Sequence, residues 1–302
     1  MAKIGEIDKL VVTTLVEDYA GYGTSFWGQH GVSFLIDVML GNTTKRILFD
    51  TGQSSEPIIH NMKILGIEPN TIDMIAISHC HFDHTGGLVG MLKQIRKQDV
   101  PVLAHPGLLR PHFIMDVPDP EYWLLSEVGM IKENTEENVR KYGGYLNLVA
   151  KPFELMPGVL WSGEVDRVTD FEKTVTLAAR TIKEGAVIED QILDDISLAV
   201  NVKDNGLFVI SGCSHAGIVN IVRQCVRISQ IEKVKAVIGG FHLIDASQDR
   251  VRKTAKALKD LEVEKVYTGH CTGFEAEMAI FGEFKENFVK LQCGQVIQSP
   301  PR

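Results

Sequence analysis

Three histidines and one aspartate lie within six residues of this chain, directly after the apolar segment 74–77. Side chains two residues apart in an extended segment face the same way, so His79 and His81 can present two imidazoles to one ion. A turn after them would bring Asp83 and His84 toward a second ion. Neutral imidazole with a minority of carboxylate is the ligand set that Zn²⁺ and its first-row neighbours prefer. The motif therefore predicts a metal site with room for two adjacent ions.

Two adjacent metal ions favour hydrolytic chemistry. Such a pair can generate hydroxide at neutral pH and can clamp an anionic substrate. The alternative is a chance cluster of histidines on a surface loop. The motif lies between a strand-like segment and the helix-like segment 87–97, and this context favours the metal site.

Segments with strand or helix character surround the motif and have to position it. Residues 10–16 and 32–40 are predicted to be strands, the second with apolar side chains at period two. The segment 19–30 between them is rich in glycine and aromatic residues, which suits a hairpin over an active site or a plain loop. Helices are expected near residues 57–65 and 87–97, so the histidine cluster would lie at a strand-to-helix turn.

Strands and helices alternate in the second half of the chain. This pattern predicts sheets covered by helices, with binding groups at the carboxyl ends of the strands. His215, His242 and His270 all follow predicted strands. The expected strands are 159–162, 175–180, 196–202, 207–211, 236–238 and 263–268, and the expected helices are 218–228, 250–261 and 274–289.

The order of these motifs resembles the metallo-β-lactamase superfamily. The motif H-x-H-x-D-H follows a buried strand, Phe49-Asp50-Thr51-Gly52 lies upstream, and glycine-flanked histidine motifs follow at 212–217 and 268–273. With the segment 238–243, they resemble the branch labelled 7,8-dihydropterin-6-yl-methyl-4-(β-D-ribofuranosyl)aminobenzene-5'-phosphate synthase. The resemblance implies one α/β domain over residues 1–302, an αβ/βα four-layer sandwich whose metals lie at the edge between two β-sheets.

The resemblance also implies roles for the site residues. Two divalent transition-metal ions are expected, with zinc first and manganese, iron or nickel as alternatives. Asp50, at a strand end, would orient a ligand imidazole or the metal-bound water. The implied ligands of the first ion are His79, His81 and one later histidine, and those of the second are Asp83, His84 and another; the family pattern supplies His215 and His270 for these places.

The chain departs from the common family pattern at Gly212-Cys213, where many relatives have Gly-Asp with an aspartate that bridges the metals. Thiolate is an excellent zinc ligand. His215 lies only two residues further on, however, and we expect it to bind the metal while Cys213 packs. Cys80 and Cys271 stand next to predicted ligands and are expected to be small buried hydrophobes.

Other polar residues near the motifs have more than one interpretation. Asp194 and Asp195 lie where a histidine commonly precedes the next strand, and either carboxylate could bind a metal or orient a ligand. His242 could hydrogen-bond a developing oxyanion or a substrate, or have a structural role. His30 is expected to be structural, and His112 to face solvent.

The regular alternation weakens between residues 107 and 157, where prolines and aromatic residues flank one polar helix candidate at 133–142. Long irregular segments inside a compact domain are usually functional or disordered. In the superfamily the comparable region often covers the metal cleft. We therefore expect a lid insertion at 107–157 that shapes the substrate site.

Composition restricts the class of protein further. Lys plus Arg number 31 and Asp plus Glu number 39, a formal net charge of −8, which argues against a general nucleic-acid-binding surface. Five cysteines without paired spacing suggest a reducing compartment, and the cytoplasm is the expected location. No stretch approaches the roughly 20 apolar residues that span a bilayer, so no membrane partner is expected. Homo-oligomerisation is left open.

The expected activity is metal-dependent hydrolysis or displacement at a small phosphate-bearing substrate. The metals would lower the pKa of a bridging water, with Asp83 or Asp50 taking a proton and His242 or a lid residue stabilising the leaving oxygen. The branch label implies displacement of pyrophosphate from a pterin by an aminobenzene ribonucleotide.

Two alternatives belong to other classes. A non-catalytic metal-dependent binding protein is disfavoured because the ligand set is complete. A redox diiron protein of the same fold typically has glutamate where His81 stands and adds a flavin domain, for which this chain has no room.

Overall fold

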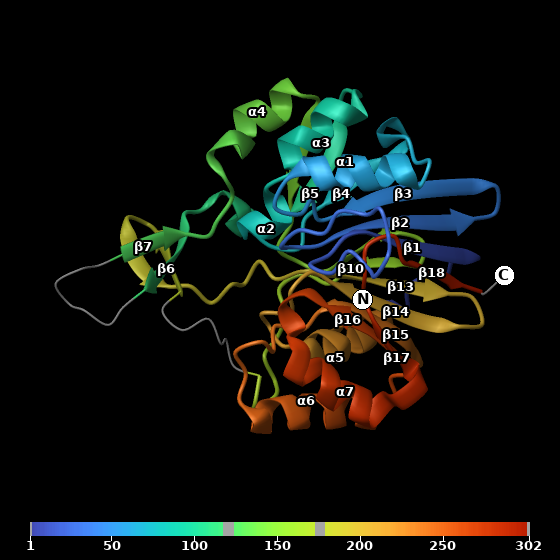
Figure 1. Cartoon of the computed structure of the whole chain (residues 1–302). Helices are drawn as coiled ribbons and strands as arrows, with labels where there is room; N and C mark the ends of the chain where they lie inside the picture. The colour runs from blue at the N-terminus through green and yellow to red at the C-terminus, as the bar shows by residue number, and fades with distance from the viewer. Residues whose placement is uncertain (1, 117–123, 173–178, 301–302) are drawn as a thin grey trace.

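Two β-sheets of seven strands each pack face to face at the centre of the described part of the chain (Figure 1). The structure, a computed structural model, describes residues 2–116, 124–172 and 179–300. In spatial order the first sheet contains β18 (Val296–Ser299), β1 (Lys9–Val16), β2 (Ser33–Leu40), β3 (Thr43–Phe49), β4 (Met74–Ala76), β5 (Val100–Ala104) and β8 (Gly144–Leu148). The second contains β17 (Phe288–Lys290), β16 (Lys265–Gly269), β15 (Val234–Gly240), β14 (Gly206–Ser211), β13 (Ser197–Val202), β10 (Val159–Trp161) and β9 (Phe153–Met156).

Helices cover the outer face of each sheet, as Figure 1 shows above and below the strands. Among the described residues, no helix is long and apolar enough to cross a membrane. The first sheet carries α1 (Ser55–Ile64), α3 (Leu88–Ile95) and α4 (Glu136–Lys141), and the second carries α5 (Ile218–Ser229), α6 (Gln248–Asp260) and α7 (Phe274–Phe284). The short helices are α2 (Phe82–Thr85), η1 (Pro69–Thr71), η2 (Pro106–Leu109), η3 (Lys132–Asn134), η4 (His270–Thr272) and η5 (Lys285–Asn287).

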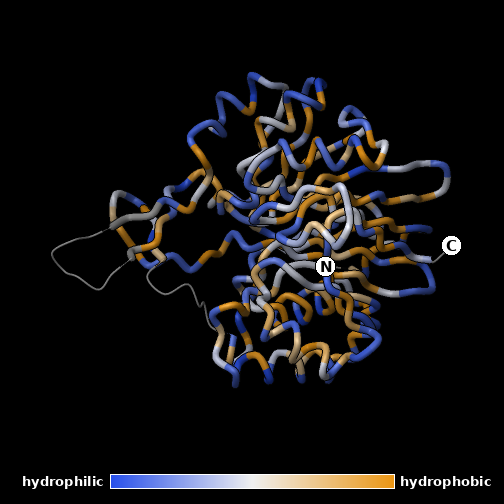
Figure 2. The backbone as a smooth tube through the Cα atoms, viewed as in Figure 1, coloured by the Kyte–Doolittle hydropathy of each residue, from blue (hydrophilic) through white to orange (hydrophobic). Residues whose placement is uncertain are grey.

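Three apolar clusters hold these four layers together. Phe34 and Ile36 of β2 pack into the cluster between the sheets, and Leu35 points the other way into the cluster under the helices. This alternation follows from the two-residue period of a strand, which gives β2 two apolar faces. Figure 2 shows apolar residues both in the central layers and in the helices above and below them. The αβ/βα four-layer sandwich expected from the family resemblance is therefore confirmed.

A third, four-stranded sheet stands at one side of the sandwich, seen at the left of Figure 1. Its strand order is β12 (Ala186–Glu189), β11 (Ala179–Lys183), β6 (His112–Asp116) and β7 (Leu124–Glu127). This sheet corrects the boundaries of the expected insertion at 107–157, because β8 and β9 within that range belong to the main sheets. Strands this short carry too little periodicity to be recognised, and β11 and β12 lie outside the expected range.

Two sequence predictions involve residues outside the described part of the chain. The insertion includes residues 117–123, and most of the strand predicted at 175–180 falls at 173–178.

His112 anchors the third sheet. The sequence analysis expected this side chain to face solvent, but it is buried. The side chain is 2% exposed, and its Nδ1 lies 2.5 Å from Oδ2 of Asp190. Its Nε2 donates to the carbonyl oxygen of Gly107 at 2.9 Å. Burial lowers the pKa of His112, but the hydrogen bond to Asp190 helps to raise it above the usual value. A buried pair of this kind ties β6 to the loop after β12.

Candidate metal centre

The predicted metal ligands lie in loops that follow the carboxyl ends of strands in both main sheets. β4 leads to the segment 79–84, β14 to the segment 212–215, β15 to His242 and β16 to His270. β14, β15 and β16 run parallel, as do β3 and β4, so these loops emerge at one edge of each sheet. Because the two sheets pack face to face, the loops of the two halves meet.

Several site residues have backbone angles that are rare for residues other than glycine. Positive φ values are costly for L-residues with a Cβ and cluster at functional sites. The four cases in these loops are Asp50 (φ 60°), Ser214 (φ 63°), His242 (φ 44°) and His270 (φ 49°). Each places a polar side chain just beyond a strand.

His79, His81 and His215 form a first group of donors. Their ligand atoms all lie within 4.8 Å of one another, with 3.0 Å between His79 Nε2 and His81 Nδ1. Nε2 of His215 is buried and has no hydrogen-bond partner among the described residues. An unpaired buried nitrogen is costly unless something binds it. A metal ion bound at this nitrogen would remove that cost.

Asp83, His84 and His270 form a second group. Oδ2 of Asp83 lies 3.3 Å from Nε2 of His84 and 3.3 Å from Nε2 of His270. The turn of α2 starts directly after His81 and brings Asp83 and His84 to this position. Nε2 of His84 is also buried without a hydrogen bond within the described residues. The second group therefore fits a second ion by the same criterion.

Asp50 holds His84 in place. Its Oδ2 accepts hydrogen bonds from His84 Nδ1 and Ser78 Oγ, both at 2.7 Å, and its Oδ1 accepts from the Ser78 backbone N–H at 2.6 Å. A Cβ at Gly212 would lie 2.6 Å from Asp50 Oδ2 and 2.2 Å from Ser78 Oγ. Glycine is thus required where the second-half loop packs on this network.

Asp18, which the sequence analysis did not select, holds His270 in the same way. Its Oδ2 accepts from His270 Nδ1 at 2.7 Å, and Glu17 Oε1 accepts from the His270 backbone N–H. His30, expected to be structural, lies in the cleft with Nδ1 3.0 Å from Asp18 Oδ1 and Nε2 3.5 Å from Asp83 Oδ2. The available signal was the position of Glu17 and Asp18 directly after a predicted strand, beside the glycine-rich loop.

Asp194 and Asp195 support the two ligand loops through the backbone. Asp194 Oδ2 accepts from the Cys80 N–H at 2.7 Å, and Asp195 Oδ2 accepts from the Ala216 N–H at 2.6 Å. Burial raises the pKa of Asp195 to about 7. Of the two roles considered from the sequence, the hydrogen bonds favour orientation of the ligand loops.

Cys213 lies among the donors together with His215. Its Sγ forms one close group with donors of His79 and His84, and it lies 3.2 Å from His242 Nδ1. From the sequence, Cys213 was expected only to pack against its neighbours. In the structure its sulphur lies close to several predicted metal ligands. Cys80, in contrast, is fully buried in the cluster under the helices of the first sheet, as expected.

The cluster divides into neutral and charged imidazoles. Burial lowers the pKa of His79 and His215 well below the usual value, and burial lowers that of His81 to about 4. Burial also disfavours charged His84, but the carboxylates of Asp83 and Asp50 raise its pKa to about 9. Neutral imidazoles are ready to bind a metal, whereas His84 would have to release a proton on binding.

Four of the six donors, His81, Asp83, His215 and His270, line a cleft of about 450 Å³ that the third sheet borders. Ile114 of β6 and Val128 contribute to its wall, and the Val128 carbonyl accepts from the Phe82 N–H at 3.0 Å. The wall contains Asp18, Asp83 and five histidines, with no lysine or arginine among the described residues. Without bound cations the cleft is therefore poorly suited to an anionic ligand.

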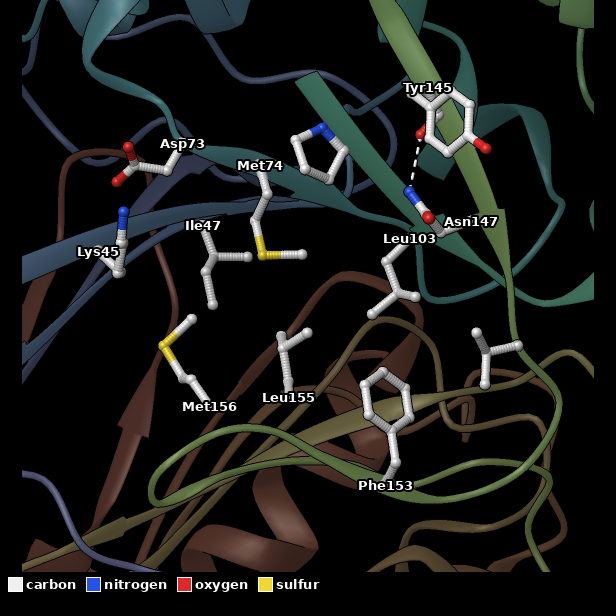
Figure 3. A pocket seen from close by; sticks show the side chains of 12 residues that line it. Lys45, Ile47, Asp73, Met74, Leu103, Tyr145, Asn147, Phe153, Leu155 and Met156 are labelled. Atoms are coloured by element: carbon white, nitrogen blue, oxygen red, sulfur yellow. Dashed lines mark hydrogen bonds between the residues drawn. The ribbon is translucent and has the colours of Figure 1, made fainter. Parts of the chain in front are cut away.

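A second cavity, of about 560 Å³, lies between the main sheets near β8 and β9 and holds none of the predicted site residues (Figure 3). Apolar side chains point into it, and Lys45 and Asp73 lie at one end. The apolar lining consists of Ile47, Met74, Pro101, Leu103, Val149, Phe153, Leu155 and Met156.

Comparisons of this chain with known proteins identify its family. The family model of the metallo-β-lactamase superfamily matches residues 27–178. A 7,8-dihydropterin-6-methyl-4-(β-D-ribofuranosyl)-aminobenzene-5'-phosphate synthase from Methanocaldococcus jannaschii is 47% identical over 300 residues, 99% of each chain.

Solved structures show the same fold. The crystal structure of a metal-dependent hydrolase of the β-lactamase superfamily matches with a TM-score of 0.77 and 26% identity, over 95% of this chain and 98% of the other. The short form of human tRNase Z, at 16% identity and a TM-score of 0.51, covers 97% of this chain and 100% of its own and shares the fold alone. The chain therefore belongs to the metallo-β-lactamase superfamily, in the branch that contains the dihydropterin–aminobenzene phosphate synthase.

Proposed function

We propose that the protein is a dinuclear metal-dependent enzyme that acts on a small phosphate-bearing substrate. The observation that carries this proposal is the pair of adjacent donor groups, each with a buried imidazole nitrogen that makes no hydrogen bond to a described residue. The name of the synthase that is 47% identical to this chain supports a pterin and an aminobenzene ribonucleotide as reactants.

Each donor group would hold one divalent ion. His79, His81 and His215 would hold the first, and Asp83, His84 and His270 the second. Zinc fits these nitrogen and oxygen donors best, and manganese, iron and nickel remain alternatives. When bound, two such ions would activate a water molecule and clamp a phosphate group.

The side chains around the donors have separate tasks in this proposal. Asp50 is fully buried and both its oxygens already accept hydrogen bonds, so we assign it the orientation of His84 and not proton transfer. Asp18 orients His270. Asp83 lines the cleft and is the carboxylate placed to take a proton from a reacting group. His242 also lines the cleft and is placed to donate an N–H to a phosphate oxygen.

A small anionic substrate would depend on the bound ions for most of its charge neutralisation. With no lysine or arginine among the described lining residues of the cleft, charge neutralisation falls to the ions and to His30, whose pKa the hydrogen bond to Asp18 raises. The third sheet would act as the substrate-shaping lid, since Ile114 and Val128 border the cleft and supply no donor to the two groups. Ile114→Ala should therefore raise KM severalfold with metal content unchanged, because less apolar surface is buried on the substrate.

A reaction assay with a pterin pyrophosphate tests the proposal. We expect release of pyrophosphate that depends on an added aminobenzene ribonucleotide 5'-phosphate and on metal reconstitution. Chelator and His79→Ala should both abolish the release. His60→Ala is the matched control, because His60 stacks on Trp27 and does not line the cleft.

A second candidate, hydrolysis of a phosphate ester or anhydride, is favoured by the similarity to the metal-dependent hydrolase at 26% identity. Pyrophosphate release without the aminobenzene ribonucleotide, or turnover of simple phosphomonoesters or phosphodiesters, would favour this candidate. Turnover confined to β-lactams, thioesters or lactones would contradict the phosphate substrate. Metal binding without any turnover would favour a binding protein.

A further inference from the structure

Two free cysteines face each other in the wall of the cleft. The Sγ atoms of Cys213 and Cys271 lie 3.0 Å apart, although the residues are 58 positions apart in the chain. Both residues line the cleft and are only 2% and 6% exposed. The sequence interpretation, a packing Cys213 and a hydrophobic Cys271, does not explain why two thiols should share a wall with histidines and carboxylates.

Hydrogen-bond donors and imidazoles surround the two sulphurs. The backbone N–H of His242 donates to Cys271 Sγ at 3.2 Å, and Nδ1 of the same residue lies 3.2 Å from Cys213 Sγ. Nε2 of His270 lies 4.0 Å from Cys213 Sγ. Both sulphurs therefore lie among imidazoles of the predicted site, and cysteine binds metals as the thiolate.

Each of the two sulphurs lies close to particular members of the two donor groups. Cys213 Sγ forms one close group with His79, from the first donor group, and His84, from the second. It forms another with His270 and Cys271. Ligand atoms within each group lie no more than 4.8 Å apart. Cys213 thus reaches both donor groups, and Cys271 reaches the one that contains His270.

We propose that Cys213 and Cys271 are thiolate ligands of the metal centre, Cys213 between the two ions and Cys271 on the ion held by His270. This inference rests on the dinuclear centre proposed above and assigns it two further ligands. Each thiol would lose its proton to solvent as its sulphur–metal bond forms. Because soft thiolate ligands select zinc and similar ions, the centre should discriminate against magnesium and manganese.

Cadmium binding followed by absorption spectroscopy tests the inference without any assay of activity. Metal-free full-length protein would be titrated anaerobically with Cd²⁺, with the ultraviolet thiolate-to-cadmium charge-transfer band and the bound cadmium measured together. We expect a band in the wild type, about two-thirds of its intensity per protein in Cys271→Ser because one of three sulphur–cadmium bonds is lost, and its loss in the double variant with Cys213→Ser. The control is Cys225→Ser, since this cysteine is buried in α5 and does not line the cleft.

The possible outcomes separate this inference from the proposed function. Two bound cadmium ions without a charge-transfer band would overturn the thiolate ligands and leave the dinuclear centre standing. No bound cadmium at all would overturn the dinuclear centre itself. A band of unchanged intensity in both serine variants would also contradict the assignment.

Protection from alkylation provides a second measurement on the unmodified protein, in case a serine variant fails to fold. With iodoacetamide and mass spectrometry, Cys213 and Cys271 should react at least tenfold more slowly in zinc-loaded than in metal-free protein. Equal rates in the two forms, or a Cys213–Cys271 disulfide in the zinc-loaded protein, would overturn the inference.

Discussion

Two cavities of similar size differ in the polar side chains that line them. The cleft at the strand ends, about 450 Å³, is lined by histidines, carboxylates and thiols. The cavity between the sheets, about 560 Å³, is lined mainly by aliphatic side chains, methionines and Phe153 (Figure 3). The larger cavity extends the core between the sheets, since Ile47, Met74 and Leu103 also belong to that core. The volumes of the two cavities therefore do not distinguish their functions, whereas the side chains that line them do.

The two linings also contribute differently to the stability of the fold. Buried polar groups cost stability unless they are paired, and the cleft contains the buried Nε2 of His215, which has no hydrogen-bond partner among the described residues. Burial of apolar side chains, as around the second cavity, stabilises the fold. Substitutions in the cleft should therefore affect metal binding and activity, whereas substitutions in the apolar cavity should affect stability.

The largest effect is expected from the predicted ligands. His79→Ala or Asp83→Ala should reduce bound metal from about two ions to one or fewer, and activity by at least about 10³-fold, since a metal supplies several kcal/mol of transition-state stabilisation. Elemental analysis after reconstitution and steady-state rates measure both. Full metal content in either variant would remove that residue from the ligand set.

A smaller effect is expected from the carboxylates that orient ligands. Asp50→Asn and Asp18→Asn should each weaken metal affinity by about 10- to 100-fold, because such partners fix ring orientation and ligand basicity. Competition with a chromophoric chelator measures this affinity. Asp73→Asn is the matched control at the other cavity, where the carboxylate accepts from the Arg46 N–H. Equal effects of all three substitutions would contradict the comparison.

Asp195 should make stability depend on pH. Burial raises its pKa in the folded protein from 3.8 to about 7. The stability contributed by the protonated form is therefore fully present below about pH 4 and is lost as pH rises through 7. Asp195→Asn should abolish this loss and gain on the order of 2 kcal/mol relative to wild type between pH 5 and pH 8. Urea unfolding at several pH values measures it, and parallel pH profiles for the two proteins would contradict the raised pKa.

The smallest effect is expected in the apolar cavity. Met74→Ala should lower the free energy of unfolding by about 1 to 2 kcal/mol, less than at a fully packed site because Met74 already borders a void. Metal content and activity should stay at wild-type levels. Chemical denaturation and elemental analysis check the two halves of this prediction. Loss of activity without loss of stability would instead assign the cavity a role in the reaction.

The sequence predicted local elements well where periodicity was strong. The strands expected at 10–16 and 32–40 are β1 and β2, and the helix expected at 250–261 is α6. The helix expected at 274–289 ends earlier, at Phe284. Lys285 has a φ of 50°, and the following β17 pairs with β16, so sheet pairing overrides the helical pattern.

By itself the sequence determined the histidine cluster at a strand-to-helix turn and the family resemblance, because these depend on residue types at short spacing, and the four-layer fold followed from that resemblance. The roles of the six predicted ligands remain a prediction, although the structure brings all six close together and four of them line one cleft. Only the tertiary structure brought Asp18 and His30 to the cleft, paired Cys213 with Cys271, and built a third sheet from strands on both sides of residues 128–178. These contacts join segments that are distant in the chain, and packing of the two sheets decides which distant segments meet.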